Sequence, residues 1–208
     1  SKLADFDIEA MNKLYGRNVI PADREVIENK CEKEILNHAR KSNAALLVVG
    51  SPLSATTHVD ILQRAKKLGI KTEVIDNASI VTAVGVTGLS IYKFGRIVTL
   101  PKSNSDVRSP YEMIMKNRKI GLHTLILLDV ENIGSGIDLM SAREGLNYLI
   151  KMGLGKDEMV VVCGGLAGDD AGIRYGKASD VRISKYPQCI IIPGELHFME
   201  EEMLDTFK

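Results

Sequence analysis

Apolar residues along the chain fall into short unbroken runs that are separated by longer amphipathic segments. Five runs rich in Val, Ile and Leu predict strands, at residues 45–49, 71–75, 122–128, 159–163 and 189–192. Because these runs are continuous rather than alternating, we expect strands covered on both faces, as in a sheet between helices. Helical patterning occurs between them, at residues 25–41, 59–68, 111–118, 141–151 and 200–207. This order predicts an α/β fold.

Two of the predicted helices carry clear local signals. In the first, one side is apolar and charged residues lie opposite, which is typical of a helix with one solvated face. The apolar side consists of Val26, Ile27, Cys31, Ile35 and Leu36. In the fourth, Ser141 and Glu144 have the spacing of a capping box.

Residues 48–58, Val-Val-Gly-Ser-Pro-Leu-Ser-Ala-Thr-Thr-His, lead from an apolar strand through a Gly/Pro turn into a helix. Ligands of open α/β folds bind where loops leave the carboxyl ends of strands. Small residues at Gly50, Ser51 and Ser54 would let a ligand approach the main chain closely. The segment is therefore a candidate ligand loop.

The same segment has a purely structural interpretation. Thr56 or Thr57 could cap the helix over residues 59–68, and Gly69 could end it. Further along, residues 100–110 are rich in Pro, Ser and Asn and lack periodicity. They predict a surface loop near a site or a flexible connection.

Composition and charge narrow the class of protein. The chain has 208 residues, of which 45% are hydrophobic, enough for one large or two small domains. Its 27 basic and 27 acidic residues cancel, so net charge favours neither nucleic acid nor an anionic membrane. The longest apolar runs are far shorter than the ~20 residues of a membrane span, and residues 1–7 do not resemble a secretory signal. We expect a soluble cytoplasmic protein.

Cysteine and histidine do not point to a metal centre. The chain has three cysteines, Cys31, Cys163 and Cys189, and four histidines, His38, His58, His123 and His197. The cysteines are odd in number and widely spaced, which fits buried small hydrophobic residues better than a disulfide framework or zinc site. The histidines show no metal-ligand spacing. We predict no metal.

Five motifs carry a specific resemblance. In chain order they are residues 50–58 (GSPLSATTH), 77–95 (NASIVTAVGVTGLSIYKFG), 121–129 (GLHTLILLD), 139–142 (LMSA) and 193–202 (PGELHFMEEE). Together they resemble the diphthine synthases, a family of the tetrapyrrole-methylase-like class of S-adenosylmethionine-dependent methyltransferases. The likeness runs over essentially the whole chain. The short connection between Asp129 and Met140 is more similar to the archaeal form than to the longer eukaryotic one.

The resemblance implies a fold, a cofactor and a partner. It implies a tetrapyrrole methylase-like fold with two α/β domains, residues 1–77 and 78–208, and S-adenosylmethionine in the cleft between them. It also implies a homodimer. The acceptor would be a modified histidine of translation elongation factor 2, whose 3-amino-3-carboxypropyl group is methylated on its amine to give diphthine. S-adenosylhomocysteine would be the second product.

The family's cofactor contacts can be carried over position by position. They fall on Ser51, Ser54, Ser79, Ile80, Leu128, Leu166 and Gln188. Hydroxyls and main-chain amides at such positions can meet the polar ends of the cofactor, while the apolar side chains can flank an adenine. Each position also has a structural alternative: Leu128 could be core, and the glycines of residues 164–168 could serve a tight turn.

The chain departs from the family pattern at three places. Gly50-Ser51-Pro52 stands where the family usually has Gly-Asp-Pro, so a neutral hydroxyl replaces a carboxylate and we expect weaker cofactor binding. Gln188 stands where histidine is usual. Family members also open with a strand, a Gly-rich turn and a helix before the region matching residues 5–24. We expect this segment to be omitted from the sequence rather than absent from a functional short form.

No catalytic residue can be assigned from the sequence. Methyl transfer needs a neutral amine about 3–3.5 Å from the methyl carbon, which is mainly a matter of positioning. A carboxylate, a histidine or water could accept the amine proton. His58 and His197 lie in the motifs, but each can equally hydrogen-bond a loop.

Three alternatives to this function remain open. The chain could be a related tetrapyrrole methyltransferase, because fold alone does not dictate substrate. It could be an RNA methyltransferase, although its neutral charge argues against RNA. It could also be a non-catalytic dimeric remnant that binds elongation factor 2, a hypothesis favoured by Ser51, Gln188 and the absent opening strand.

Overall fold

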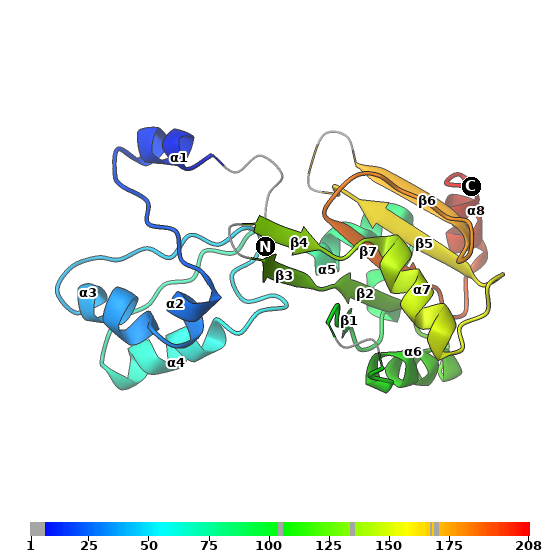
Figure 1. The fold of residues 1–208 in the computed structure, drawn as a ribbon, viewed down its shortest axis with the longest axis horizontal. Coiled ribbons are helices and arrows are strands. Elements are labelled where there is room, and N and C mark those ends of the chain that lie inside the picture. The colour runs from blue at the N-terminus through cyan, green and yellow to red at the C-terminus, as the bar shows by residue number, and fades with distance from the viewer. Residues whose placement is uncertain (1–6, 104–105, 134–135, 167, 169–170) are drawn as a thin grey trace. The chain divides into compact units, whose positions relative to one another are not determined.

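The computed structural model describes residues 7–103, 106–133, 136–166, 168 and 171–208. The chain divides into two compact units, Ser1–Ser79 and Ile80–Lys208 (Figure 1). The expected domain boundary after residue 77 stays a prediction.

The second unit is built on a five-stranded sheet with the strand order β1-β2-β7-β5-β6. Its strands are β1 (Val98–Leu100), β2 (Thr124–Leu128), β5 (Met159–Gly164), β6 (Gly172–Lys177) and β7 (Gln188–Ile192). β1 and β2 are parallel, and every other neighbouring pair in this sheet is antiparallel. The three strands predicted in this part of the chain are confirmed as β2, β5 and β7. The separate pair β3 (Val130–Ile133) and β4 (Gly136–Leu139) was not predicted.

Helices pack on both faces of this sheet, as its continuous apolar strands require (Figure 1). They are α5 (Ile80–Ala83), α6 (Ser109–Lys119), α7 (Ala142–Met152) and α8 (Phe198–Asp205), with 3-10 turns at Val84–Thr87 and Ile91–Lys93. Ile190 packs into a cluster with Leu146 of α7, whereas Ile191 packs into a second cluster with Leu204 of α8. Successive residues of β7 therefore serve two cores, because side chains alternate across a strand.

The sequence signals for these helices agree with the structure. The predicted helices at residues 111–118, 141–151 and 200–207 are confirmed as α6, α7 and α8. Ser141 and Glu144 form the predicted capping box at the start of α7. The predicted loop at residues 100–110 overlaps the end of β1 and the start of α6, and its residues 104–105 lie outside the described part of the chain.

The first unit is helical. It contains α1 (Ile8–Tyr15), α2 (Arg24–Glu28), a π-helical turn (Glu32–Leu36), α3 (Asn37–Ala39) and α4 (Val59–Lys67). The single helix predicted over residues 25–41 is wrong, because the backbone amides of Asn29 and Lys30 both donate to the Glu25 carbonyl and end α2 there. Its apolar face is nevertheless confirmed. Cys31 and Leu36 pack with Ile61 and Ala65 in the small core of this unit.

The strands predicted at residues 45–49 and 71–75 are also wrong. Neither segment is a strand, and neither pairs with another strand in the described residues. Leu47 is 48% exposed and Ile75 is 81% exposed. An apolar run signals a preference for burial, but a strand also requires a neighbour that satisfies its backbone hydrogen bonds. The pattern of a single run contains no information on that neighbour.

The core on the α7 face gives a direct test of this packing. Leu146 is fully buried in that core, so Leu146→Ala is expected to lower the free energy of unfolding by roughly 2–5 kcal/mol. Urea titration followed by circular dichroism measures the loss. The neighbouring Asn147→Ala is a matched control because Asn147 is exposed on the same helix. Similar losses in both variants would contradict the packing described.

Candidate functional site

Three strand ends meet at one end of the sheet in the second unit. In the strand register, Cys189 lies opposite Leu127 of β2 and opposite Cys163 of β5, while Gln188 lies opposite Gly164. The carboxyl ends of β2 and β5 therefore flank the beginning of β7. Such sheet ends are where α/β folds bind ligands.

Gln188 is buried at this sheet end and uses both ends of its amide. Its Oε1 accepts a hydrogen bond of 2.7 Å from the Ala142 backbone amide at the start of α7. Its Nε2 donates to the Ile183 carbonyl at 3.1 Å. Gln188 thus ties both α7 and the segment before β7 to the sheet.

Leu128 ends β2 and Leu166 follows β5 at this end of the sheet, and Ile80 packs in a core of the same unit. Leu128 is half-buried at the end of β2 and packs against the α7-side core. Leu166 lies in the turn after β5, and both Leu166 and Ile80 pack against the α8-side core. Ala167 of the same turn lies outside the described residues. The fold thus places Leu128, Leu166 and Gln188 at one end of the sheet, although the two leucines pack into cores on opposite faces.

In the first unit, the predicted ligand loop is held by short polar contacts. The Ser51 amide donates to the Ala78 carbonyl at 2.8 Å, which brings the loop beside the segment that contains Ser79. The Ser54 hydroxyl donates to the Ser51 hydroxyl at 2.9 Å. Three of the predicted cofactor residues therefore belong to two adjacent segments of this unit.

The backbone of the same loop adopts unusual conformations. Gly50 has a φ of +80°, and a Cβ there would lie 3.2 Å from the Ala78 carbonyl oxygen. Ala55 has a φ of 54°, in the left-handed region that residues other than glycine rarely adopt. Strained residues of this kind concentrate at functional sites.

The His58 side chain holds the loop together through a backbone contact. Its Nδ1 lies 2.9 Å from the Pro52 carbonyl oxygen, to which a protonated Nδ1 donates. The predicted cap by Thr56 or Thr57 is wrong, because α4 begins after His58 with no side-chain cap. The predicted end at Gly69 is confirmed by its φ of +70°.

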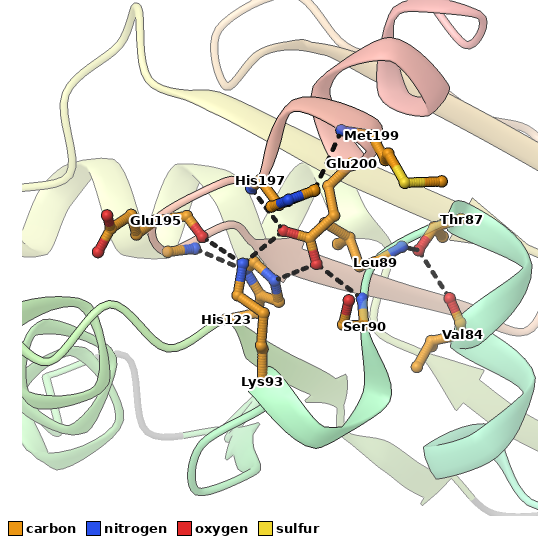
Figure 2. A network of polar contacts seen from close by, with 11 residues as sticks. Val84, Thr87, Leu89, Ser90, Lys93, His123, Glu195, His197, Met199 and Glu200 are labelled. Atoms are coloured by element: carbon orange, nitrogen blue, oxygen red, sulfur yellow. Dashed lines mark hydrogen bonds and ion pairs between the residues drawn. The ribbon is translucent and has the colours of Figure 1, made fainter.

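A second polar cluster surrounds Glu200, which is only 2% exposed (Figure 2). Its Oε1 accepts from the Ser90 amide at 2.8 Å and from His123 Nε2 at 3.3 Å. Its Oε2 accepts from the His197 amide at 2.9 Å and from the Lys93 ammonium. These contacts anchor the start of α8 to the residue that precedes β2 and to the segment before β1.

The ionisation states in this cluster follow from its geometry. The Gly194 amide donates to His123 Nδ1 at 2.9 Å, so the proton is on Nε2 and points to Glu200. Burial lowers the pKa of His123 and outweighs the attraction of Glu200. Burial also opposes ionisation of Glu200, but hydrogen bonds from His197, Lys93 and Ser90 outweigh it and hold the Glu200 pKa well below its ordinary value.

The Glu200 cluster is structural rather than catalytic. Each carboxylate oxygen of Glu200 already accepts two hydrogen bonds, so it has little capacity left to accept a substrate proton. His197 caps α8 through its side chain. This cluster was not predicted from the sequence, although the spacing of His197 and Glu200 is that of a capping pair. The partners of Glu200 in distant segments, Ser90, Lys93 and His123, cannot be recognised from the local sequence around it.

Two further features concern metals and membranes. Among the described residues, no group of three or more His, Cys, Asp or Glu side chains is placed to hold a metal ion. No helix in the described ranges is long and apolar enough to cross a membrane. All three cysteines are buried and unbridged, which confirms their prediction as small buried residues.

Comparison with known proteins defines the class. Residues 8–168 match the model of the tetrapyrrole (corrin/porphyrin) methylases. This match covers more than half of the chain, and the chain belongs to that family of methylases.

Individual relatives narrow the class further. The diphthine synthase of Methanococcus aeolicus is 37% identical over 209 residues, covering 95% of this chain and 80% of the relative. Diphthine methyl ester synthase 2 of Candida albicans is 49% identical over 142 residues, covering 67% of this chain and 47% of the relative. A crystal structure of diphthine synthase superposes with a TM-score of 0.87 at 29% identity, over 97% of this chain and 80% of that one. Within the methylases, the chain therefore belongs to the diphthine synthase family.

The Glu200 cluster predicts a pH-dependent stability. Both pKa values are lowered in the folded state, so stability is expected to fall as the pH drops below 6.5 for His123 and further below 4.5 for Glu200. Glu200→Gln should remove about 3 kcal/mol at neutral pH, because it leaves Lys93 without its charged partner. It should also flatten the pH dependence below 4.5.

Urea unfolding at a series of pH values measures both effects. Glu201→Gln is the matched control, since Glu201 is exposed on the same helix. If the free energy of unfolding of Glu200→Gln falls below pH 4.5 as steeply as that of the wild type, other carboxylates account for the pH dependence.

The ligand loop predicts a difference between two glycines. Gly69→Ala meets only backbone strain, because no atom lies within 4 Å of its added Cβ, and should lower the free energy of unfolding by about 1 kcal/mol. Gly50→Ala should lower it further, because its Cβ also meets the Ala78 carbonyl. Thermal and urea unfolding compare the two variants. Equal losses would show that the segment containing Ala78 moves aside freely.

Proposed function

We propose that this chain transfers a methyl group from S-adenosylmethionine to the amine of the 3-amino-3-carboxypropyl histidine on translation elongation factor 2, which gives diphthine. The observation that supports this most is that Leu128, Leu166 and Gln188 all lie at one end of the same sheet. These positions correspond to the family's cofactor contacts, and the relatives named diphthine synthase match nearly the whole chain.

The residues at the predicted positions fit such a cofactor in part. The left-handed Gly50 and the small side chains of Ser51 and Ser54 permit close approach to the main chain. Leu128 and Leu166 each offer apolar surface at this end of the sheet, one on each face, and either can contact an adenine. Gln188 fits less well, because both ends of its amide already bind backbone groups. Its contribution is to position the turn and helix around it.

The chemistry needs little from the protein beyond positioning. When bound, S-adenosylmethionine supplies an activated methyl group on a sulfonium. The residues of this chain hold the acceptor amine in line, exclude water and accept the proton that the amine must lose. His58, His197 and Glu200 are engaged in local hydrogen bonds.

We propose Asp129 as the acceptor of that proton. It directly follows Leu128 at the sheet end. Its Oδ2 accepts from the Lys102 amide at 3.3 Å and its Oδ1 from the Val130 amide at 2.9 Å. Each carboxylate oxygen thus retains a lone pair that can accept a proton from the amine, directly or through water.

The finer features of this function stay predictions. They are the cofactor cleft between two domains, the homodimer and the cytoplasmic location. The proposed partner is a protein, and the formal net charge of zero does not favour nucleic acid.

Calorimetric titration with S-adenosylhomocysteine tests the proposal. We expect one-to-one binding in the micromolar range, followed by methylation of the modified elongation factor 2 detected by mass spectrometry. A folded protein that binds no S-adenosylhomocysteine would overturn the proposal and favour a non-catalytic remnant. Binding with methylation of a tetrapyrrole or RNA instead would reassign the substrate.

The residue at position 51 gives a gain-of-affinity prediction. Ser51→Asp restores the carboxylate that the family usually has in this loop and should tighten S-adenosylhomocysteine binding about tenfold, as one added charged hydrogen bond would. Calorimetry measures the change. Ser42→Asp, an exposed serine elsewhere in the same unit, controls for the added charge. Equal effects of both variants, or none, would show that position 51 does not contact the cofactor.

A further inference from the structure

A groove beside the sheet end of the second unit is markedly basic. It is lined by Gly172, Arg174, Arg182, Ile183, Ser184 and Lys185. Three of these six side chains are cationic, although the chain as a whole has a formal net charge of zero. Among the described residues that line this groove, positive charge therefore predominates.

The groove adjoins the predicted cofactor residues directly. Gly164, which pairs with Gln188, also pairs with Gly172 of the groove. A Cβ on Gly164 would lie 2.5 Å from the Lys185 carbonyl oxygen, so the segment of residues 183–185 lies against the end of β5. Gln188 holds this segment in place through the Ile183 carbonyl.

The two arginines of the groove keep unused donors. Arg174 Nη1 donates to the carbonyl of its neighbour Ile173 at 3.0 Å. Arg182 donates from Nη1 to the Val181 carbonyl at 2.8 Å and from Nη2 to the Ser179 carbonyl at 2.9 Å. All these acceptors are neutral backbone oxygens. In the described part of the chain, neither guanidinium forms an ion pair with a carboxylate.

Such guanidinium groups suit one class of ligand. A guanidinium presents a planar fork of donors that matches the two oxygens of a carboxylate. The acceptor group of the proposed reaction carries a carboxylate on the same carbon as the amine that is methylated. Recognition of that carboxylate would orient the amine.

We propose that Arg174 and Arg182 bind the carboxylate of the 3-amino-3-carboxypropyl group, an inference that rests on the proposed function. The groove adjoins the sheet end that contains Gln188 and Leu128, so a carboxylate bound there leaves the amine beside the predicted cofactor positions. The two arginines are thus substrate-positioning residues. They contribute no proton or covalent step.

The double variant Arg174→Gln and Arg182→Gln tests this assignment in the whole protein. Its affinity for S-adenosylhomocysteine, measured by calorimetry, should equal that of the wild type. Its KM for modified elongation factor 2 should rise at least tenfold, as expected when a charged recognition contact is lost. Arg96→Gln is the matched control, because Arg96 is exposed and precedes β1 at the opposite edge of the same sheet.

Equilibrium binding of elongation factor 2 in its modified and unmodified forms separates the possible sources of the carboxylate. The assignment predicts that the double variant loses affinity for the modified form only. Equal losses of affinity for both forms would overturn the assignment and indicate that an acidic surface of the factor binds in the groove. Unchanged binding and KM would overturn it as well.

The same measurements keep this inference distinct from the proposed function. A wild-type protein that binds no S-adenosylhomocysteine and methylates nothing would refute the proposed function. The comparison of binding to the two forms of the factor would still test the roles of Arg174 and Arg182, because binding needs no turnover. A wild-type protein that does not distinguish the two forms of the factor would refute the groove assignment even if methylation occurs.

Discussion

The pairing of β7 on both of its edges is the constraint on which the second unit depends. β2 and β5 each hydrogen-bond to it in a fixed register, and alternate side chains of β7 enter the cores on the two faces. A shift of one residue would exchange these faces. It would also move Gln188 away from Gly164 and separate the strand ends that form the candidate site. Fold and site are thus set by the same ladder of hydrogen bonds.

The sequence predicted those parts of the fold that depend on local pattern. β2, β5 and β7 were found because an unbroken apolar run is unusual outside a strand buried on both faces. The capping box of Ser141 and Glu144 was found because its partners are neighbours in the chain. The segments at residues 45–49 and 71–75 show the limit of this reasoning. Their composition is that of strands, yet a strand exists only where another strand pairs with it.

The candidate site was predicted through resemblance more than through physical pattern. The resemblance named Leu128, Leu166 and Gln188, but only the strand register shows that the strands carrying them end at the same end of the sheet. The second role of Gln188, as a link between Ala142 and Ile183, depends on contacts between distant segments. Glu200 and the basic groove were missed for the same reason. Buried networks and grooves arise from tertiary contacts that leave no periodic trace in a sequence.

Cys163 and Cys189 lie opposite each other in this arrangement, Cys163 as the second-last residue of β5 and Cys189 as the second residue of β7. A hydrogen bond with Cys163, together with burial, raises the pKa of the Cys189 thiol. Only a thiolate reacts readily with alkylating reagents, so the native sheet shields this sulfur both sterically and electronically. Its labelling rate therefore reports how often the sheet opens at the candidate site. Cys189 is thus a native probe of local unfolding at the end of the sheet where ligand binding would suppress that unfolding.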